Sequence, residues 1–153
     1  MNGGTMRRAI VMAVAAAVLA CSDSGPSAER FFAVLSSQSE VPPAVSGGGG
    51  TANFTVNGSG IDYSVILQTL VGVSAIQLDS GAAGDVGPVL ASLYSGPTTG
   101  TISTAAFTGT LTSAAVSVPI DSLLAWMRRS KVYVNVLTTG QPAGELRGQV
   151  APQ

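Results

Sequence analysis

The strongest constraint on the fold is a strict alternation of apolar and polar residues on both sides of an Asn-Gly turn. Apolar residues occupy every second position of TANFTV (51–56). After the connection NGSG (57–60), the same alternation resumes in IDYSVIL (61–67). Alternate side chains of a strand point to opposite faces of its sheet, and Asn-Gly is favoured in tight turns between strands. The stretch 51–67 therefore predicts a β-hairpin with one buried face.

Six further segments have the length and composition of short β-strands. Each is rich in apolar or β-branched residues, and clusters of Gly, Pro, Asn and Ser separate them. These predicted strands are 31–35, 73–79, 88–94, 105–111, 131–137 and 144–150. Many short strands with turn residues between them are typical of a two-sheet fold. We therefore predict an all-β domain, an antiparallel β-sandwich of the immunoglobulin-like or Greek-key type.

One segment, PIDSLLAWMRRS (119–130), has the period of a helix instead. Its apolar residues recur at 120, 123, 124 and 127, which forms one face of a short α-helix. Pro119 suits the first turn of the helix. The basic pair Arg128 and Arg129 follows at the C-terminus, which is the negative end of the helix dipole. We interpret these charges as complementing the helix terminus; a patch of Arg128, Arg129 and Lys131 that binds an anionic partner is the alternative.

The beginning of the chain has the pattern of an export signal. MRR (6–8) is positively charged, and the run AIVMAVAAAVLA (9–20) that follows is uncharged. A transmembrane helix needs about 20 apolar residues, so this run is too short to span a bilayer. A basic start followed by a short apolar run predicts a signal peptide, here residues 1–20.

The apolar run ends in VLAC (18–21), which resembles the lipobox of bacterial lipoproteins. The resemblance implies that Cys21, the single cysteine of the chain, receives the lipid after cleavage. Because stable anchoring needs more than one acyl chain, a multiply acylated cysteine would be sufficient. The polar residues 21–29 are then a flexible tether. This predicts an exported lipoprotein anchored in a membrane of the cell envelope, at the outer membrane or cell surface; a cleaved signal with an unrelated cysteine is the alternative.

Several landmarks of the folded part occur in a familiar order. They are SEVPP (39–43), a Gly-rich turn ending in GPV (87–89), YVNV (133–136) and GELRGQV (144–150). In this order they resemble the CHRD domain, and the similarity covers residues 30–150. The resemblance implies a β-sandwich that serves as an extracellular binding or structural module and not as an enzyme.

The CHRD resemblance also identifies positions at which the family usually carries histidine. A His-x-His pair falls on Gln77 and Asp79, and a third histidine falls on Leu137, whereas this chain has no histidine at all. Glutamine and leucine are poor ligands for zinc or copper, so we predict no transition-metal site and no cofactor. The alternative is a metal-binding module at the turn DSGAAGD, either a degenerate transition-metal site or a calcium site with Asp79, Asp85 and backbone carbonyls as ligands.

The remaining residue inventory argues against catalysis and against nucleic acid. Without histidine, and with Lys131 as the only lysine, no Ser, Thr or Cys has an evident activating base. The net charge of −1 gives no basic stripe for nucleic acid. Glu145 and Arg147 are two apart in a predicted strand, and we interpret them as an exposed pair on an edge strand. The predicted partners are a membrane, through the lipid anchor, and a protein or an envelope polymer.

Overall fold

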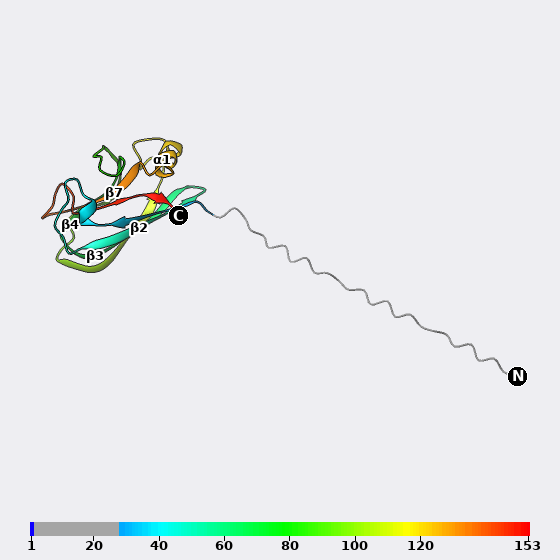
Figure 1. Cartoon of the computed structure of the whole chain (residues 1–153), viewed down its shortest axis with the longest axis horizontal. Coiled ribbons are helices and arrows are strands. Elements are labelled where there is room, and N and C mark those ends of the chain that lie inside the picture. The colour runs from blue at the N-terminus through cyan, green and yellow to red at the C-terminus, as the bar shows by residue number, and fades with distance from the viewer. Residues whose placement is uncertain (2–27) are drawn as a thin grey trace.

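The hairpin predicted from the Asn-Gly turn lies at the centre of a five-stranded antiparallel sheet (Figure 1). The computed structural model describes Met1 and residues 28–153; the predicted signal peptide, Cys21 and most of the predicted tether lie outside the described residues. β2 (Gly49–Asn57) and β3 (Gly60–Val71) pair as far as Asn57 opposite Gly60. The strands thus extend into the predicted connection, and only residues 58 and 59 form the loop.

Two sheets pack face to face, which confirms the predicted β-sandwich. The first sheet has the order β6-β3-β2-β1-β9, and its other strands are β1 (Arg30–Leu35), β6 (Thr101–Leu111) and β9 (Ala151–Pro152). The second sheet has the order β5-β4-β7-β8, with β4 (Val73–Ser80), β5 (Val89–Ser95), β7 (Val132–Thr138) and β8 (Leu146–Gln149).

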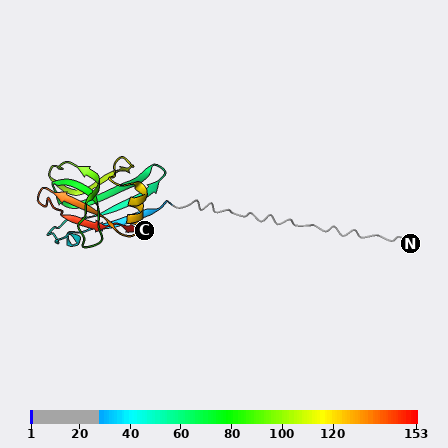
Figure 2. The ribbon, with the colours of Figure 1, turned by 90° about the horizontal axis from the view of Figure 1, so that it is seen from above.

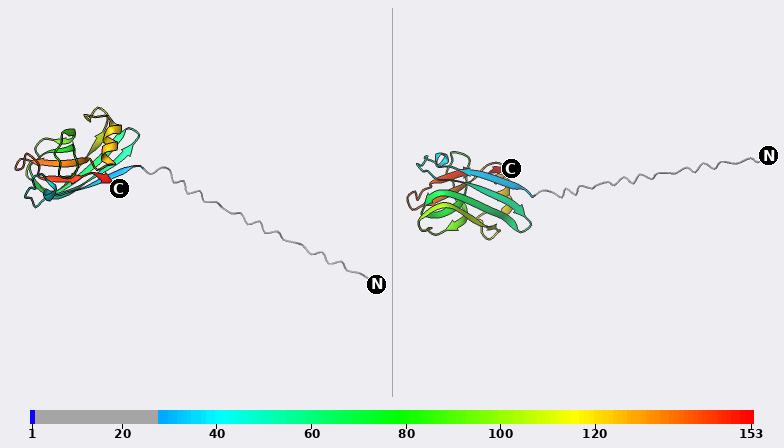
Figure 3. Two further views of the ribbon diagram at one scale, coloured as in Figure 1. Left: turned by 45° about the horizontal axis from the view of Figure 1, so that its top comes forward. Right: turned by 90° about the horizontal axis from the view of Figure 1, so that it is seen from below.

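The connectivity interlocks the two sheets. The chain passes from β3 in the first sheet directly to β4 in the second sheet, and it later crosses again from the first sheet to the second between β6 and β7. β6 pairs with β3 and β7 pairs with β4, so both crossings connect neighbouring strands of one sheet to neighbouring strands of the other. This is the Greek-key arrangement of immunoglobulin-like sandwiches. Figure 2 shows the second sheet from its outer side, and the right panel of Figure 3 shows the first.

The core lies between the sheets and is mostly aliphatic, as alternating strands require. Burial of one large apolar side chain stabilises a fold by about 1.5–3 kcal/mol. The largest fully buried apolar side chains are Phe31, Phe54, Ile61, Leu67, Leu70, Ile76, Leu78, Leu111, Leu123, Met127 and Leu146.

The predicted helix is present as α1 (Ile120–Met127), at one end of the sandwich (Figure 3, left). It follows Pro119 and buries Leu123, Leu124 and Met127, as its apolar spacing predicts. Arg128 caps its end and forms an ion pair with Glu29 at 2.6 Å, in agreement with a structural role for this charge. Within residues 28–153, no helix is long and apolar enough to cross a membrane.

Two loops cover the outer face of the second sheet. The first, residues 36–48, contains the short 3-10 helix η1 (Ser37–Ser39) and connects β1 to β2. The second, residues 81–88, connects β4 to β5 and is held by a bond from the Gly81 N–H to the Lys131 carbonyl (2.8 Å). Side chains that a bare sheet would expose to water are therefore enclosed beneath these loops.

Candidate functional site

Neighbouring strands of the second sheet direct polar side chains to the same outer face. In β7, three valines face the core, so the intervening Tyr133 and Asn135 point outward. The register places Asp79 of β4 opposite Tyr133, and Arg147 of β8 opposite Asn135. Strand pairing alone thus brings together a carboxyl group, a phenol, an amide and a guanidinium group.

The loop 36–48 completes this group by adding Glu40 directly after η1. Ser36 initiates η1 by accepting a hydrogen bond from the Gln38 N–H (3.2 Å), and its own backbone bonds to Arg147. We call Glu40, Asp79, Tyr133, Asn135 and Arg147 the polar cluster. Its members are all at least nine-tenths buried, with exposed fractions from 1% for Tyr133 to 9% for Asn135.

Arg147 lies at the centre of the polar cluster. Its guanidinium carbon is 3.4 Å from the centroid of the Tyr133 ring, a cation–π contact. One terminal N–H donates to the Ala82 carbonyl oxygen at 2.9 Å, which fastens the loop 81–88 to β8. The same loop donates the Gly87 N–H to the Tyr133 hydroxyl at 3.3 Å.

The interpretation of Glu145 and Arg147 as an exposed pair is wrong. Arg147 is only 3% exposed, and Glu145 accepts hydrogen bonds from the hydroxyls of Ser46 (2.6 Å) and Thr138 (2.5 Å). β8 is an edge strand, as expected, but the two loops cover its outer face. A polar residue on the outer face of an edge strand is therefore buried here.

Burial raises the pKa of both carboxyl groups in the cluster. For Asp79, desolvation raises the pKa more than Asn135, Tyr133 and Arg147 lower it. For Glu40, desolvation is again the largest cause, and the nearby Asp79 raises the pKa further, while Arg147 lowers it. The site therefore favours the neutral acid form of these groups at pH values where exposed carboxyls are ionised.

Several buried oxygen atoms in and beside the cluster accept no hydrogen bond from the described residues. They are Glu40 Oε1, Asp79 Oδ1, Asn135 Oδ1 and Gln149 Oε1. The oxygens of Glu40 and Asn135 converge above Gly144, where an added Cβ would lie 2.7 Å from Glu40 Oε1 and from Asn135 Oδ1. Leaving a buried acceptor unpaired costs about 1–3 kcal/mol, so each of these atoms favours a nearby donor.

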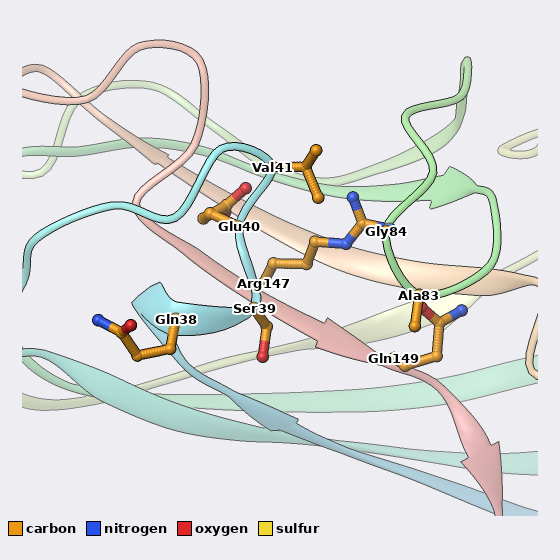
Figure 4. A pocket seen from close by; sticks show the side chains of 8 residues that line it. All are labelled: Gln38, Ser39, Glu40, Val41, Ala83, Gly84, Arg147 and Gln149. Atoms are coloured by element: carbon orange, nitrogen blue, oxygen red, sulfur yellow. The ribbon is translucent and has the colours of Figure 1, made fainter.

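A pocket of about 280 Å³ opens above the cluster, between the two loops (Figure 4). Figure 4 shows Arg147 extending from β8 between the loop that carries Glu40 and Val41 and the loop that carries Ala83 and Gly84. The other lining residues are Gln38, Ser39 and Gln149. The pocket thus offers guanidinium, amide and hydroxyl donors together with carboxyl and amide acceptors to a polar ligand.

The three family-motif positions lie on the same outer face of β4 and β7. Gln77 is opposite Asn135, Asp79 is opposite Tyr133, and Leu137 is opposite Ala75. Leu137 is therefore a diagonal neighbour of Gln77, at a spacing of about 7–8 Å between such positions. Of the three, the structure brings only Asp79 into the polar cluster.

The two carboxylates of the calcium alternative lie in different environments. Asp79 is 3% exposed beneath the loops, whereas Asp85 lies on the exposed surface of the turn. Within residues 28–153, no group of three or more His, Cys, Asp or Glu side chains is placed to hold a metal ion.

Sequence reasoning missed most of the cluster. Glu40, Tyr133 and Asn135 lie within the landmarks SEVPP and YVNV, but the sequence predicted no role for their side chains. One signal was available in the sequence. Only 10% of the residues are charged, so the presence of Glu40 in the landmark SEVPP and of Arg147 in GELRGQV could have indicated a role for these two side chains.

Comparison with known proteins identifies one family. The family profile of the CHRD domain matches residues 31–150, which include both sheets up to the end of β8, the helix and the whole polar cluster. No curated protein and no solved structure matches the chain.

Proposed function

Because this chain belongs to the CHRD domain family through residues 31–150, we propose that it is a non-catalytic binding module held at the cell envelope by lipid on Cys21. Membership of the family indicates an extracellular-type binding module. The finer proposal adds the lipid anchor, which rests on the sequence VLAC, and the site of binding, which rests on the pocket above the polar cluster.

The pocket is the observation that carries the binding role. Binding sites combine a preformed concavity with a few fixed polar groups. Here Arg147 is held by Tyr133 and by the Ala82 carbonyl, so its guanidinium is fixed before any ligand arrives. Glu40 and Gln149 also line the pocket, and each has one buried oxygen without a donor beneath its surface. A ligand with both hydroxyl or amide donors and carbonyl acceptors fits this pattern.

The absence of histidine supports a non-catalytic role. The chain has a single lysine, and the two carboxyls whose pKa is raised by burial, Glu40 and Asp79, belong to a group that stabilises the loops around Arg147. The partner that we propose is an envelope polymer or protein that presents polar groups to the two loops.

Filling the pocket is expected to weaken binding without disturbing the fold. Ala83 is exposed on the rim, so Ala83→Trp would place an indole over the pocket. We expect at least a tenfold loss of cosedimentation with purified peptidoglycan sacculi, the probe for an envelope polymer, and an unchanged melting temperature. Ala114→Trp, at an exposed position on the loop after β6, is the matched control. Equal retention of both variants would contradict the assignment of the pocket; no binding by the unmodified chain would exclude this polymer as its partner.

Replacing Cys21 is expected to release the protein from membranes. Each buried methylene of an acyl chain contributes about 0.8 kcal/mol to anchoring, so loss of all acyl chains removes the attachment. For Cys21→Ser we expect an unprocessed precursor that incorporates no labelled palmitate, whereas Ser22→Ala should be processed and sediment with membranes like the unmodified chain. Membrane attachment and cleavage of Cys21→Ser at the same position would show that the leader is an ordinary signal.

A further inference from the structure

The sandwich has four edge strands, and three of them are blocked. β9 consists of two residues and includes Pro152, which has no N–H to donate. β8 is closed by reciprocal backbone bonds between Arg147 and Ser36, and β5 by the bond from the Ser117 N–H to the Leu90 carbonyl (2.8 Å). Natural sheets protect their edges in such ways because an open edge pairs with other strands.

β6 is the exception among the described strands. It has 11 residues, TISTAAFTGTL, and pairs on one side with β3 only. It contains no charged residue and no proline, the two residue classes that most often protect an edge. Within residues 28–153, no backbone hydrogen bond to another segment covers its free side. Six of its 11 residues are exposed: Thr101, Ser103, Thr104, Ala106, Thr108 and Thr110.

We propose that β6 pairs with β6 of a second copy of this chain, in antiparallel orientation, so that two first sheets join into one continuous sheet across a two-fold axis. An isologous contact of this kind needs a surface that complements itself. β6 fulfils this condition because an uncharged strand meets its own copy without any repulsion between like charges.

The strand itself defines the register of this contact. Outward-facing residues must meet outward-facing residues, because a shift by one position would reverse the faces. The two-fold axis therefore passes through a residue, and full overlap of Thr101–Leu111 places it at Ala106. Ala106 then faces its own copy, and Thr104 faces Thr108 of the second copy. Small and β-branched side chains of this kind pair well across strands.

A second copy fits the edge better than an unrelated strand. The nearest charge on the outer face is Asp62 of β3, opposite Thr110, and its carboxylate already accepts hydrogen bonds from Asn57 and Thr110 (2.6 Å each). Among the described residues, β6 therefore has no unpaired charge beside it that would favour a charged partner. A chain tethered to a membrane also meets its own copies at high local concentration, although the pairing itself requires neither the anchor nor the pocket.

Disulfide trapping tests the register in the full chain within its membrane. Residues that face each other in antiparallel strands have Cα atoms about 4.5–5.5 Å apart, within the range of a disulfide. Under mild oxidation we expect Ala106→Cys to form a disulfide-linked dimer at least tenfold more efficiently than Thr110→Cys, whose copies would lie far apart. The unmodified chain, which has only Cys21, controls for cross-links at that residue.

A charge exchange gives an independent test of the same axis. Ala106→Lys and Ala106→Glu should each be monomeric by sedimentation velocity in detergent, because two like charges would face each other, and their mixture should restore the dimer. An unmodified chain that is monomeric throughout, or Ala106→Cys that cross-links no better than Thr110→Cys, would overturn the proposal. Cross-linking of Ala106→Cys to a different protein would also overturn it, because the edge would then receive another partner.

Discussion

Replacing Arg147 by methionine is expected to lower the free energy of unfolding by about 3–5 kcal/mol at neutral pH. Methionine keeps much of the length of the side chain but has no charge. The change removes the cation–π contact with Tyr133, worth about 2 kcal/mol when desolvated, and leaves the Ala82 carbonyl without its donor. It also removes the positive charge that lowers the pKa of Glu40 and of Asp79. Denaturant unfolding of both proteins measures the difference.

The pH dependence of this loss separates charge from packing. When Glu40 and Asp79 are protonated, they no longer need a neighbouring cation, so the loss should be smaller at acidic pH than at neutral pH. Arg147→Lys keeps the charge but not the planar group, and we expect an intermediate loss. Arg128→Met removes an exposed partner of Glu29 and should change stability little. A loss for Arg147→Met that is equal at all pH values would contradict the electrostatic role.

Strand positions could be predicted from the sequence because the alternation that specifies them is local. The strands around 51–67 and 131–137 were placed within a few residues of their observed bounds, since one buried face repeats at every second position. The prediction was less complete for β6, which begins at Thr101 and not at residue 105. Ser103 and Thr104 are both exposed, so the alternation is lost there.

The polar cluster could not be predicted because it depends on contacts between segments that are distant in the sequence. The alternation in β8 correctly turns Arg147 away from the core, and a local pattern then predicts exposure to water. Whether a loop covers that face depends on the bonds between Ser36 and Arg147 and between Arg147 and Ala82. Glu40 lies in an irregular loop without any period. Its position beside Asp79 is determined by the tertiary fold and not by the residues next to it in the sequence.

The two cluster carboxyls are expected to make the protein less stable as the pH rises. The pKa of Glu40 and the pKa of Asp79 are raised above their ordinary values of 4.5 and 3.8, mainly by desolvation. Between the unfolded and the folded pKa, the native state binds more protons than the unfolded state, so stability falls with rising pH. Each such proton contributes a slope of at most about 1.4 kcal/mol per pH unit. The pH range over which stability falls begins near these ordinary pKa values and extends to higher pH.

Neutral isosteres isolate this contribution from the other titrating groups. In Glu40→Gln combined with Asp79→Asn, the fall in unfolding free energy between pH 4 and pH 8 should be smaller than in the unmodified chain. Asp62→Asn is the control with the opposite sign, because hydrogen bonds from Thr110 and Asn57 lower the pKa of Asp62. The stabilisation by Asp62 is present above its ordinary pKa and is lost as the pH falls. Parallel stability curves for the double variant and the unmodified chain would show that Glu40 and Asp79 titrate alike in the folded and unfolded states.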